Sequence, residues 1–409
     1  MASPRRLRIK QLLIIFFLPA LPTIYAQNSG KEYLKKVLTK LEKIESATYN
    51  ITNESWQHGD STALSILHGF VKEYNNPMDS TIGASYVSLD ANDTTKMDFY
   101  YDGNIRALTY HDNKKLVIDD FTFRPLPFRP VSPPFFNHAK NIIQYALTTK
   151  DHTTLELKDE GNDYYFKLVI DENQQVEFFG KAYHLPLPPF DIGNTTSIYE
   201  LWIDKSNDLP YKKRREMSHD ISVSTCSDLQ INNLAINDFN TAHYFPEDYE
   251  IVKYSDLHKK DGDSSASELI GRKAPAWILE NIEAQPVSLA DCKSKIILIN
   301  FTGIGCGACQ AAIPFLKQLK DSFNSEEFDL IAIESWSRKT SAIRNYANRK
   351  ELNYIILNAT NEVIKQYQTG GAAPYFFIMD HERIIRKVIR GYSKENTDKE
   401  IINAIKELL

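Results

Sequence analysis

Two cysteines separated by two residues, Cys306 and Cys309, lie between an apolar run and a segment with helical character. The run "KIILINF" (295–301) has the length and composition of a buried strand, and residues 307–323 have a helical pattern. A Cys-x-x-Cys pair at such a junction places the first thiol beside the unpaired amides and the positive dipole end of the helix. These groups stabilise a thiolate and lower the thiol pKa from about 8.5 to about 7 or below. The pattern therefore predicts a redox pair in which Cys306 is the nucleophile and Cys309, one turn later, is the resolving thiol.

Three other interpretations of this pair stay open at this point. A zinc site needs four ligands, and no His or second Cys pair stands at zinc spacing, so no metal is expected. A peroxide-reducing thiol usually follows a Pro-x-x-x-Thr-x-x-Cys frame, which "LINFTGIGC" lacks. A purely structural disulfide would close a two-residue loop and gain little chain entropy. The favoured prediction is a redox-active Cys306–Cys309 disulfide without any further cofactor.

Strand and helix patterns alternate through the last third of the chain. After the first strand and helix, strand patterns follow at 328–335, 354–359, 375–379 and 384–390, and helical patterns at 340–351, 361–368 and from about 396. Such alternation, closing on a hairpin, predicts an α/β domain over residues 272–409 with a central mixed sheet covered on both faces.

The region before it, residues 27–254, has a different pattern. Residues 31–46 carry one apolar face at helical spacing, and a second short helix is expected at 137–148. Between and after them, short alternating segments with turn signals such as Asp102-Gly103 indicate a meander of β-hairpins. The predicted fold is therefore a two-domain chain, with a mainly β, α+β domain of curved antiparallel sheet and helices before the α/β domain.

Three segments break these patterns. Residues 121–136 and 184–190 are rich in proline and aromatic residues, and because proline cannot donate to a sheet ladder they are expected to be loops or edge covers. Residues 255–271 are polar, rich in Ser and Asp, and without periodicity. They are the predicted linker between the two domains.

The first 26 residues have the features of a secretory signal peptide. Four basic residues are followed by a short apolar run, and small Ala26 precedes Gln27 as a cleavage point. The apolar run is about half the roughly 20 residues that a membrane-spanning helix needs, which disfavours an anchor. Cleavage would move the formal net charge from −5 to −9, and such an acidic protein is a poor binder of nucleic acid. We expect a location in the periplasm or cell envelope.

Once these parts are combined, the C-terminal third resembles the thioredoxin-like superfamily and, within it, the exported TlpA-type thiol-disulfide oxidoreductases. The resemblance is carried by the following segments: "GRKAPAWIL", "VSLADCKSKIILINF", the Cys-x-x-Cys, Pro314 at the family's helix kink, "GGAAPYFFIMD" and "RGY". It implies that Pro374 follows a cis peptide bond and lies against the cysteine pair. It also implies that the backbone of Ala373 pairs with the substrate chain.

Several positions near the cysteines depart from the family pattern. Asn300 stands where thioredoxins commonly carry a buried carboxylate, and Ala312 stands where TlpA-type proteins often carry Glu. Either acid would help to move the proton of the resolving thiol, so the sequence leaves this proton carrier unidentified. Gly307 and Ala308 separate the cysteines, and Ala308 replaces a common proline. The reduction potential therefore cannot be taken from the motif, since this fold spans about 150 mV, or roughly 7 kcal/mol.

The bulk around the first cysteine is also reduced. Thr302 and Gly305 stand where tryptophans are usual in the family, which is expected to open the surface beside Cys306. The other two cysteines, Cys226 and Cys292, are expected to be buried or idle thiols, with a bond between them as the alternative.

The N-terminal region resembles, more weakly, the LolA/LppX-like half-barrels of envelope lipoprotein carriers, through "YELWIDKSNDLPYKKRR" and "YFPEDY". That resemblance implies a curved sheet over helices, with an apolar hollow for a lipid or apolar peptide. The alternative is that the same aromatic residues form a packed core.

The leading prediction is thus an exported thiol-disulfide oxidoreductase that reduces disulfides in substrate proteins and receives electrons from a membrane-borne thiol donor. The alternatives are a carrier of lipid or another apolar ligand with an auxiliary redox domain, and a disulfide isomerase or oxidase.

Overall fold

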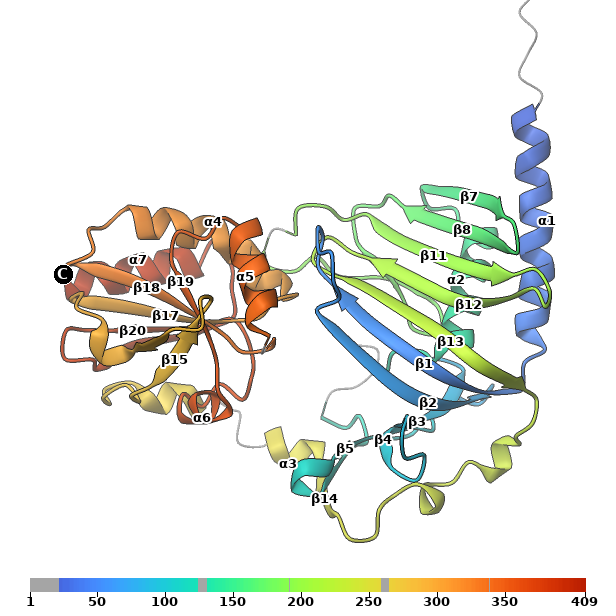
Figure 1. Cartoon of the computed structure of the whole chain (residues 1–409), viewed down its shortest axis with the longest axis horizontal. Coiled ribbons are helices and arrows are strands. Elements are labelled where there is room, and N and C mark those ends of the chain that lie inside the picture. Colours follow the sequence, from blue (N-terminus) through green and yellow to red (C-terminus); the bar gives the residue numbers. More distant parts are fainter. Residues whose placement is uncertain (1–21, 124–130, 191, 259–264, 338) are drawn as a thin grey trace, which may run out of the picture.

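The computed structural model describes residues 22–123, 131–190, 192–258, 265–337 and 339–409. Two regions are distinguished by their sheets (Figure 1). The N-terminal region contains one large, mostly antiparallel sheet with few helices, and the C-terminal region contains a mixed sheet with helices. The predicted fold class is therefore confirmed. Among the described residues, no helix is both long and apolar enough to cross a membrane.

The N-terminal sheet has twelve strands in the order β14-β6-β5-β4-β3-β2-β1-β13-β12-β11-β8-β7. Adjacent strands of this sheet are antiparallel, except that β14 runs parallel to β6. The strands are β1 (Ser46–Trp56), β2 (Ser65–Asn75), β3 (Ala84–Asp90), β4 (Met97–Tyr101), β5 (Arg106–Tyr110), β6 (Lys115–Asp119), β7 (Thr153–Glu160), β8 (Asp163–Ile170), β11 (Ser197–Asp204), β12 (Leu209–Glu216), β13 (Ile221–Ile231) and β14 (Glu250–Lys253). A separate hairpin joins β9 (Val176–Phe178) to β10 (Ala182–His184). Consecutive hairpins form most of the sheet, as the turn signals predicted.

Two helices cover one face of this sheet, α1 (Pro22–Glu42) and α2 (Phe135–Thr148). The predicted end of the first helix at residue 46 is wrong, because Ser46 already belongs to β1 and Ile44 is buried in the turn between them. Residues 1–21 of the predicted signal peptide lie outside the described residues, as do residues 124–130 of the first proline-rich segment. The described remainder of both proline-rich segments forms no strand apart from His184, which ends β10.

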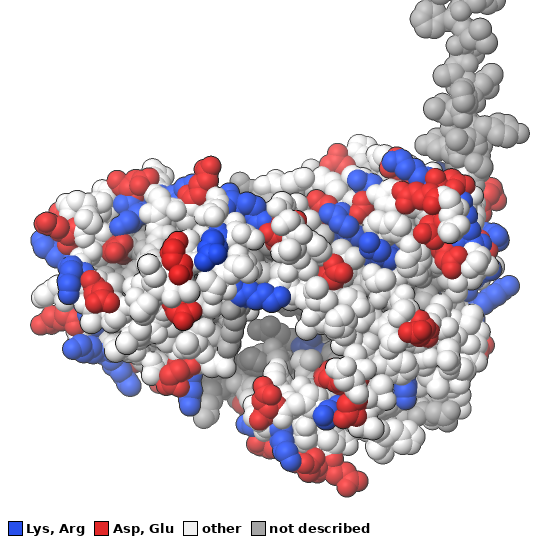
Figure 2. All heavy atoms as spheres, viewed as in Figure 1, with Lys and Arg blue, Asp and Glu red and all other residues white. Residues whose placement is uncertain are grey.

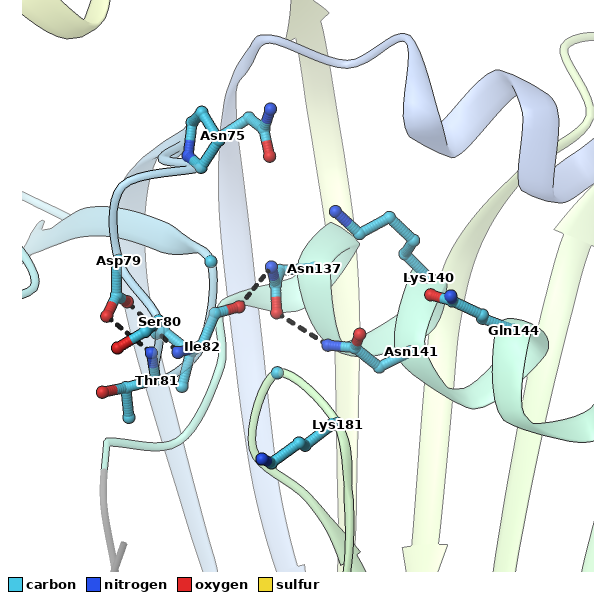
Figure 3. A pocket seen from close by; sticks show the side chains of 13 residues that line it. Asn75, Asp79, Ser80, Thr81, Ile82, Asn137, Lys140, Asn141, Gln144 and Lys181 are labelled. Atoms are coloured by element: carbon cyan, nitrogen blue, oxygen red, sulfur yellow. Dashed lines mark hydrogen bonds between the residues drawn. The ribbon is translucent and has the colours of Figure 1, made fainter. Parts of the chain in front are cut away.

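The space between the sheet and these helices is a packed core. Its aromatic members are each at most 3% exposed and come from both helix and strands: Tyr49, Phe135, Phe136, Phe166, Phe178 and Tyr199. A cavity of about 290 Å³ beside α2 is lined largely by polar residues, including Asn137, Lys140, Asn141 and Lys181 (Figure 3). These features favour the packed-core alternative over an apolar hollow.

A buried carboxylate ties α2 to the sheet. Glu73 of β2 is 4% exposed and accepts hydrogen bonds from the backbone amides of Phe136 and Asn137 at 3.1 and 2.7 Å. These amides belong to the first turn of α2, where the helix dipole favours a negative group. The hydroxyl of Tyr49 donates a further hydrogen bond to Glu73 at 2.8 Å. Together these contacts fix the start of the helix against the strands.

The C-terminal sheet has seven strands in the order β16-β15-β19-β18-β17-β20-β21. They are β15 (Ile278–Asn281), β16 (Pro286–Ser288), β17 (Ile296–Thr302), β18 (Phe328–Glu334), β19 (Ile355–Asn358), β20 (Tyr375–Met379) and β21 (Ile385–Arg390). The helices are α4 (Gly307–Asp321), α5 (Thr340–Arg349), α6 (Asn361–Gln366) and α7 (Thr397–Leu408). Strands β17, β18 and β19 are parallel, while β20 and β21 are antiparallel to their neighbours, so the predicted mixed sheet is confirmed.

Alternate side chains of β17 enter two different cores. Ile296 and Leu298 pack into a cluster with α4 and α7, whereas Ile297, Ile299 and Phe301 pack into a cluster with α6. A strand buried on both faces explains why its sequence is a continuous apolar run. The predicted linker begins with the last residues of α3 (Tyr254–His258) and includes a 3₁₀ turn, Ser265–Leu269; residues 259–264 lie outside the described residues.

Candidate redox site

The cysteine pair lies where β17 leaves the sheet and α4 begins. Cys306 is the N-cap of α4, and the backbone amide of Cys309 donates a hydrogen bond to the Cys306 sulfur at 3.1 Å. The two cysteines form a disulfide with their Cα atoms 5.2 Å apart. The turn before them uses Gly305 with φ +89°, a conformation in which glycine is favoured because it has no Cβ. The local sequence thus places one sulfur at the end of the helix where amides are unpaired.

The two cysteines differ in exposure. Cys306 is 6% exposed and Cys309 is 1% exposed. Of this pair, Cys306 is therefore the one that a substrate sulfur can approach more readily. The roles of nucleophile for Cys306 and resolving thiol for Cys309 remain predictions.

The loop before β20 lies against Cys306. The Cys306 sulfur is 3.7 Å from the carbonyl oxygen of Ala373. The Ala373–Pro374 peptide bond is cis, as predicted, and Tyr375 then begins β20. Since β20 pairs directly with β17, the sheet itself brings this loop to the cysteines.

The other predicted neighbours are found on β17 and α4. Pro314 lies inside α4, and Gly307 and Ala308 form the start of that helix. Asn300 lies within β17, is 2% exposed, and its side-chain oxygen has no hydrogen-bond partner among the described residues. Ala312 is fully buried in the core behind α4. The structure therefore gathers these residues around one strand-to-helix junction.

A buried acid that the sequence interpretation missed lies at the end of the adjacent strand. Glu334 ends β18, pairs in register with Thr302 and is 0% exposed. Its carboxylate accepts hydrogen bonds from the amides of Ile304 at 2.9 Å, Trp336 at 2.8 Å and Ser337 at 2.7 Å. Burial raises its pKa to about 7, although the three amides oppose this shift. The only signal in the sequence was an acid ending the apolar run "FDLIAIE".

Trp336, two residues after the end of β18, also lies at the site. A Cβ on Gly303 would lie 2.4 Å from the Trp336 ring, so the ring occupies the space that a side chain at 303 would need. The indole nitrogen donates to the carbonyl of Gly371 at 2.8 Å, in the loop before Pro374. Positions 302 and 305 lack the tryptophans that are usual in the family. The indole of Trp336, from the segment after β18, lies beside Gly303 instead.

The remaining cysteines are separate from this site. Cys226 in β13 is buried and Cys292 is half-buried, and neither forms a disulfide. Burial raises the pKa of both thiols. Burial is thus confirmed for Cys226 and is partial for Cys292, and the structure does not contain the alternative bond between them. Among the described residues, no group of three or more His, Cys, Asp or Glu side chains is arranged to hold a metal ion.

Comparison with known proteins agrees with this geometry. Residues 270–388 match the AhpC/TSA family. The thiol-disulfide oxidoreductase ResA of Bacillus subtilis is 27% identical over 146 residues, which are 36% of this chain and 79% of the relative. ResA of Bacillus cereus is 23% identical over 130 residues, or 32% of this chain and 75% of the relative.

The C-terminal domain is thioredoxin-like. It is an AhpC/TSA-type thiol-disulfide oxidoreductase domain, related to the ResA and TlpA-type proteins, and it carries the Cys306–Cys309 pair. Among solved structures, a thiol:disulfide interchange protein of Chlorobium tepidum covers 32% of this chain and 95% of its own, with 26% identity and a TM-score of 0.28. The thioredoxin domain of a Bacteroides vulgatus thiol-disulfide oxidoreductase covers 33% and 98%, with 22% identity and a TM-score of 0.29. The resemblance of the N-terminal region to LolA-like half-barrels finds no support in these comparisons.

Proposed function

We propose that this protein is an exported oxidoreductase that reduces disulfide bonds in substrate proteins. The observation that carries the proposal is the placement of the Cys306 sulfur at the start of α4, 3.1 Å from the Cys309 amide and beside the Ala373 carbonyl. An amide donor and the helix dipole favour a thiolate at this position. The Ala373 backbone beside it suits an extended substrate chain.

The reaction uses the reduced pair as a two-electron donor. The Cys306 thiolate attacks one sulfur of the substrate disulfide, which forms a mixed disulfide and releases the other substrate sulfur as a thiolate that takes up a proton. Cys309 then loses its proton and attacks the Cys306 sulfur, which releases the second substrate thiol and leaves the Cys306–Cys309 disulfide. A membrane-borne dithiol donor would return two electrons to this disulfide. Pro374 and Ala373 would position the substrate, while Asn300, Gly307, Ala308 and Pro314 shape the junction.

The same proposal assigns the parts of the chain. Residues 1–26 serve as a cleaved signal peptide, 27–254 as the β-rich domain, 255–271 as a linker and 272–409 as the redox domain. The site of action is the periplasm or cell envelope. The disulfide-rich setting of that compartment is the reason a reductant would be needed there.

Reduction of insulin by dithiothreitol tests the activity. The mature protein should accelerate the precipitation of reduced insulin, and Cys306→Ser should abolish the acceleration, whereas Cys292→Ser, which removes a thiol away from the site, should leave it unchanged. Equal activity in Cys306→Ser would refute the assignment. Equilibration against glutathione buffers then tests the direction, because a potential at or above that of glutaredoxins would contradict a reductase.

A further inference from the structure

The surface around Cys306 is formed by both domains. The turn between β1 and β2, the segment that ends at Phe190 and the turn between β12 and β13 all lie against the first turn of α4. Figure 1 shows the ends of β1, β12 and β13 on the side of the N-terminal sheet that lies beside the C-terminal domain. Segments that are distant in sequence therefore meet at the redox site.

Side chains of the N-terminal domain lie next to the residues before and after Cys306. A Cβ on Gly307 would be 3.5 Å from the Phe190 ring and 3.7 Å from the ring of His219. A Cβ on Gly305 would be 3.4 Å from the side-chain amide of Gln57. These are ordinary or slightly close van der Waals distances. Phe190 and His219 thus lie directly beside the backbone between the two cysteines.

Polar contacts hold the two domains together at this point. The side-chain amide of Gln310, in α4, donates to Gln57 at 3.3 Å and to the carbonyl of His219 at 3.1 Å. The guanidinium of Arg349 pairs with the carboxylate of Asp60. Asp60 also accepts a hydrogen bond from the backbone amide of Gln57 at 3.1 Å, so the same carboxylate stabilises the β1–β2 turn and connects it to Arg349.

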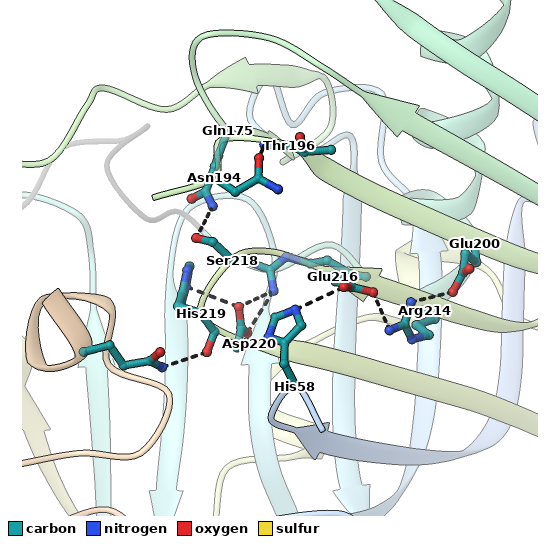
Figure 4. Close-up of polar contacts among 12 residues, drawn as sticks. His58, Gln175, Asn194, Thr196, Glu200, Arg214, Glu216, Ser218, His219 and Asp220 are labelled. Atoms are coloured by element: carbon teal, nitrogen blue, oxygen red, sulfur yellow. Dashed lines mark hydrogen bonds and ion pairs between the residues drawn. The ribbon is translucent and has the colours of Figure 1, made fainter. Parts of the chain in front are cut away.

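The β12–β13 turn, which carries His219, is fixed by hydrogen bonds and ion pairs to other residues of the N-terminal region. Gln175 donates to the Ser218 hydroxyl at 3.2 Å (Figure 4). Arg215 pairs with Asp220 at 2.9 Å. Arg215 also pairs with Glu177. A contact surface whose side chains are fixed by such neighbours binds with less loss of conformational freedom. On the face of the molecule drawn in Figure 2, Lys, Arg, Asp and Glu are interspersed rather than gathered into a patch of one sign.

We propose that Phe190, with His219 and Gln57, forms one wall of the substrate site, so that the N-terminal domain selects the polypeptide that Cys306 attacks. The proposal rests on the proposed function. The substrate segment lies between this wall and the Ala373 carbonyl, with its cysteine at Cys306. An apolar side chain next to that cysteine contacts the half-buried Phe190 ring. The preferred partner is therefore an extended disulfide-bearing segment with an apolar residue beside its cysteine.

Two symmetric disulfides of a short peptide test this wall, one with Leu and one with Ser beside the cysteine. The reduced full-length mature protein donates two electrons to each disulfide, two peptide thiols are released, and dithiothreitol regenerates the Cys306–Cys309 dithiol. The wild type should reduce the Leu peptide with a kcat/KM about five-fold above that for the Ser peptide, the scale expected for partial burial of one apolar side chain. The difference should lie in KM.

Phe190→Ala should remove this preference, so that the Leu and Ser peptides are reduced with the same kcat/KM. Phe190→Gln, which keeps bulk but loses the aromatic face, is a second variant and should behave in the same way. Phe123→Ala is the matched control, because Phe123 is an N-terminal aromatic that is 41% exposed and packs on Tyr254 at 6.0 Å. It should retain the preference.

Two outcomes would overturn the wall. Unchanged preference in both Phe190 variants would show that the ring does not contact substrate. Reduction of the Leu and Ser peptides by the wild type with equal kcat/KM would show that the N-terminal domain merely covers Cys306. A wild-type protein that reduces neither peptide disulfide would instead contradict the proposed function. Failure of the wall and failure of the reductase assignment therefore give different results.

Discussion

Replacing Glu334 by Gln should remove a pH dependence from the stability of the redox domain. Glu334 is 0% exposed, and burial raises its pKa from 4.5 to about 7. The folded state therefore holds this proton more tightly than the unfolded state does. The stability that follows is fully present below about pH 4.5 and is lost as the pH rises through about 7.

The size of this effect follows from the two pKa values. The gap from 4.5 to about 7 corresponds to about 3 kcal/mol in the free energy of unfolding, at roughly 1.4 kcal/mol per pH unit. Gln does not titrate, so it contributes no slope. Its NH₂ group would face the Ile304 amide in place of an acceptor, which costs about 1 kcal/mol or more. This cost is the same at every pH, so it lowers the free energy of unfolding without changing its dependence on pH.

Urea unfolding between pH 4.5 and 8.5 measures the difference. Trp56 and Trp202 are replaced by Phe in all proteins, so that fluorescence reports Trp277 and Trp336 of the C-terminal domain. The unfolding free energy of the Glu334 protein, minus that of Glu334→Gln, should fall by about 3 kcal/mol across this range. Glu351→Gln, the same substitution at a side chain that is 86% exposed, is the control. A flat difference for Glu334→Gln would refute the raised pKa.

Two further changes at the site have defined outcomes. Cys309→Ser should remove the resolving thiol, so that a mixed disulfide between Cys306 and a substrate protein accumulates and appears as a dithiothreitol-sensitive band on non-reducing gels; a band that persists in the Cys306→Ser, Cys309→Ser double variant would contradict this. Gly303→Ala places a Cβ 2.4 Å from the Trp336 ring, so it should lower the free energy of unfolding by about 1 to 3 kcal/mol and change the fluorescence emission of Trp336. Gly271→Ala is the control, because its Cβ would meet no atom within 4 Å although its φ is +82°. It should leave the Trp336 emission unchanged.

Most of the C-terminal fold was predictable because its signals are local. Strand β17 is a continuous apolar run since both of its faces are buried, and the cysteines follow it directly. The short strands β15 and β16, on one side of the sheet, were missed because three or four residues carry no readable period. Glu334 was missed for another reason. Its environment depends on the Ile304 amide, 30 residues away in sequence, and only the parallel pairing of β17 and β18 brings them together.

The small residues around Cys306 show what the sequence alone could not supply. Thr302 and Gly305, which stand where tryptophans are usual in the family, predict an open surface beside Cys306. In the fold, the three glycines at this junction each face a side chain from elsewhere. Gly303 faces Trp336 from the segment after β18, Gly305 faces Gln57 from the β1–β2 turn, and Gly307 faces Phe190 from the segment after β10. Gln57 lies 253 residues from its partner Gln310. The glycines therefore make room for another strand end and another domain, and any change in substrate preference should be sought in those distant segments rather than between the cysteines.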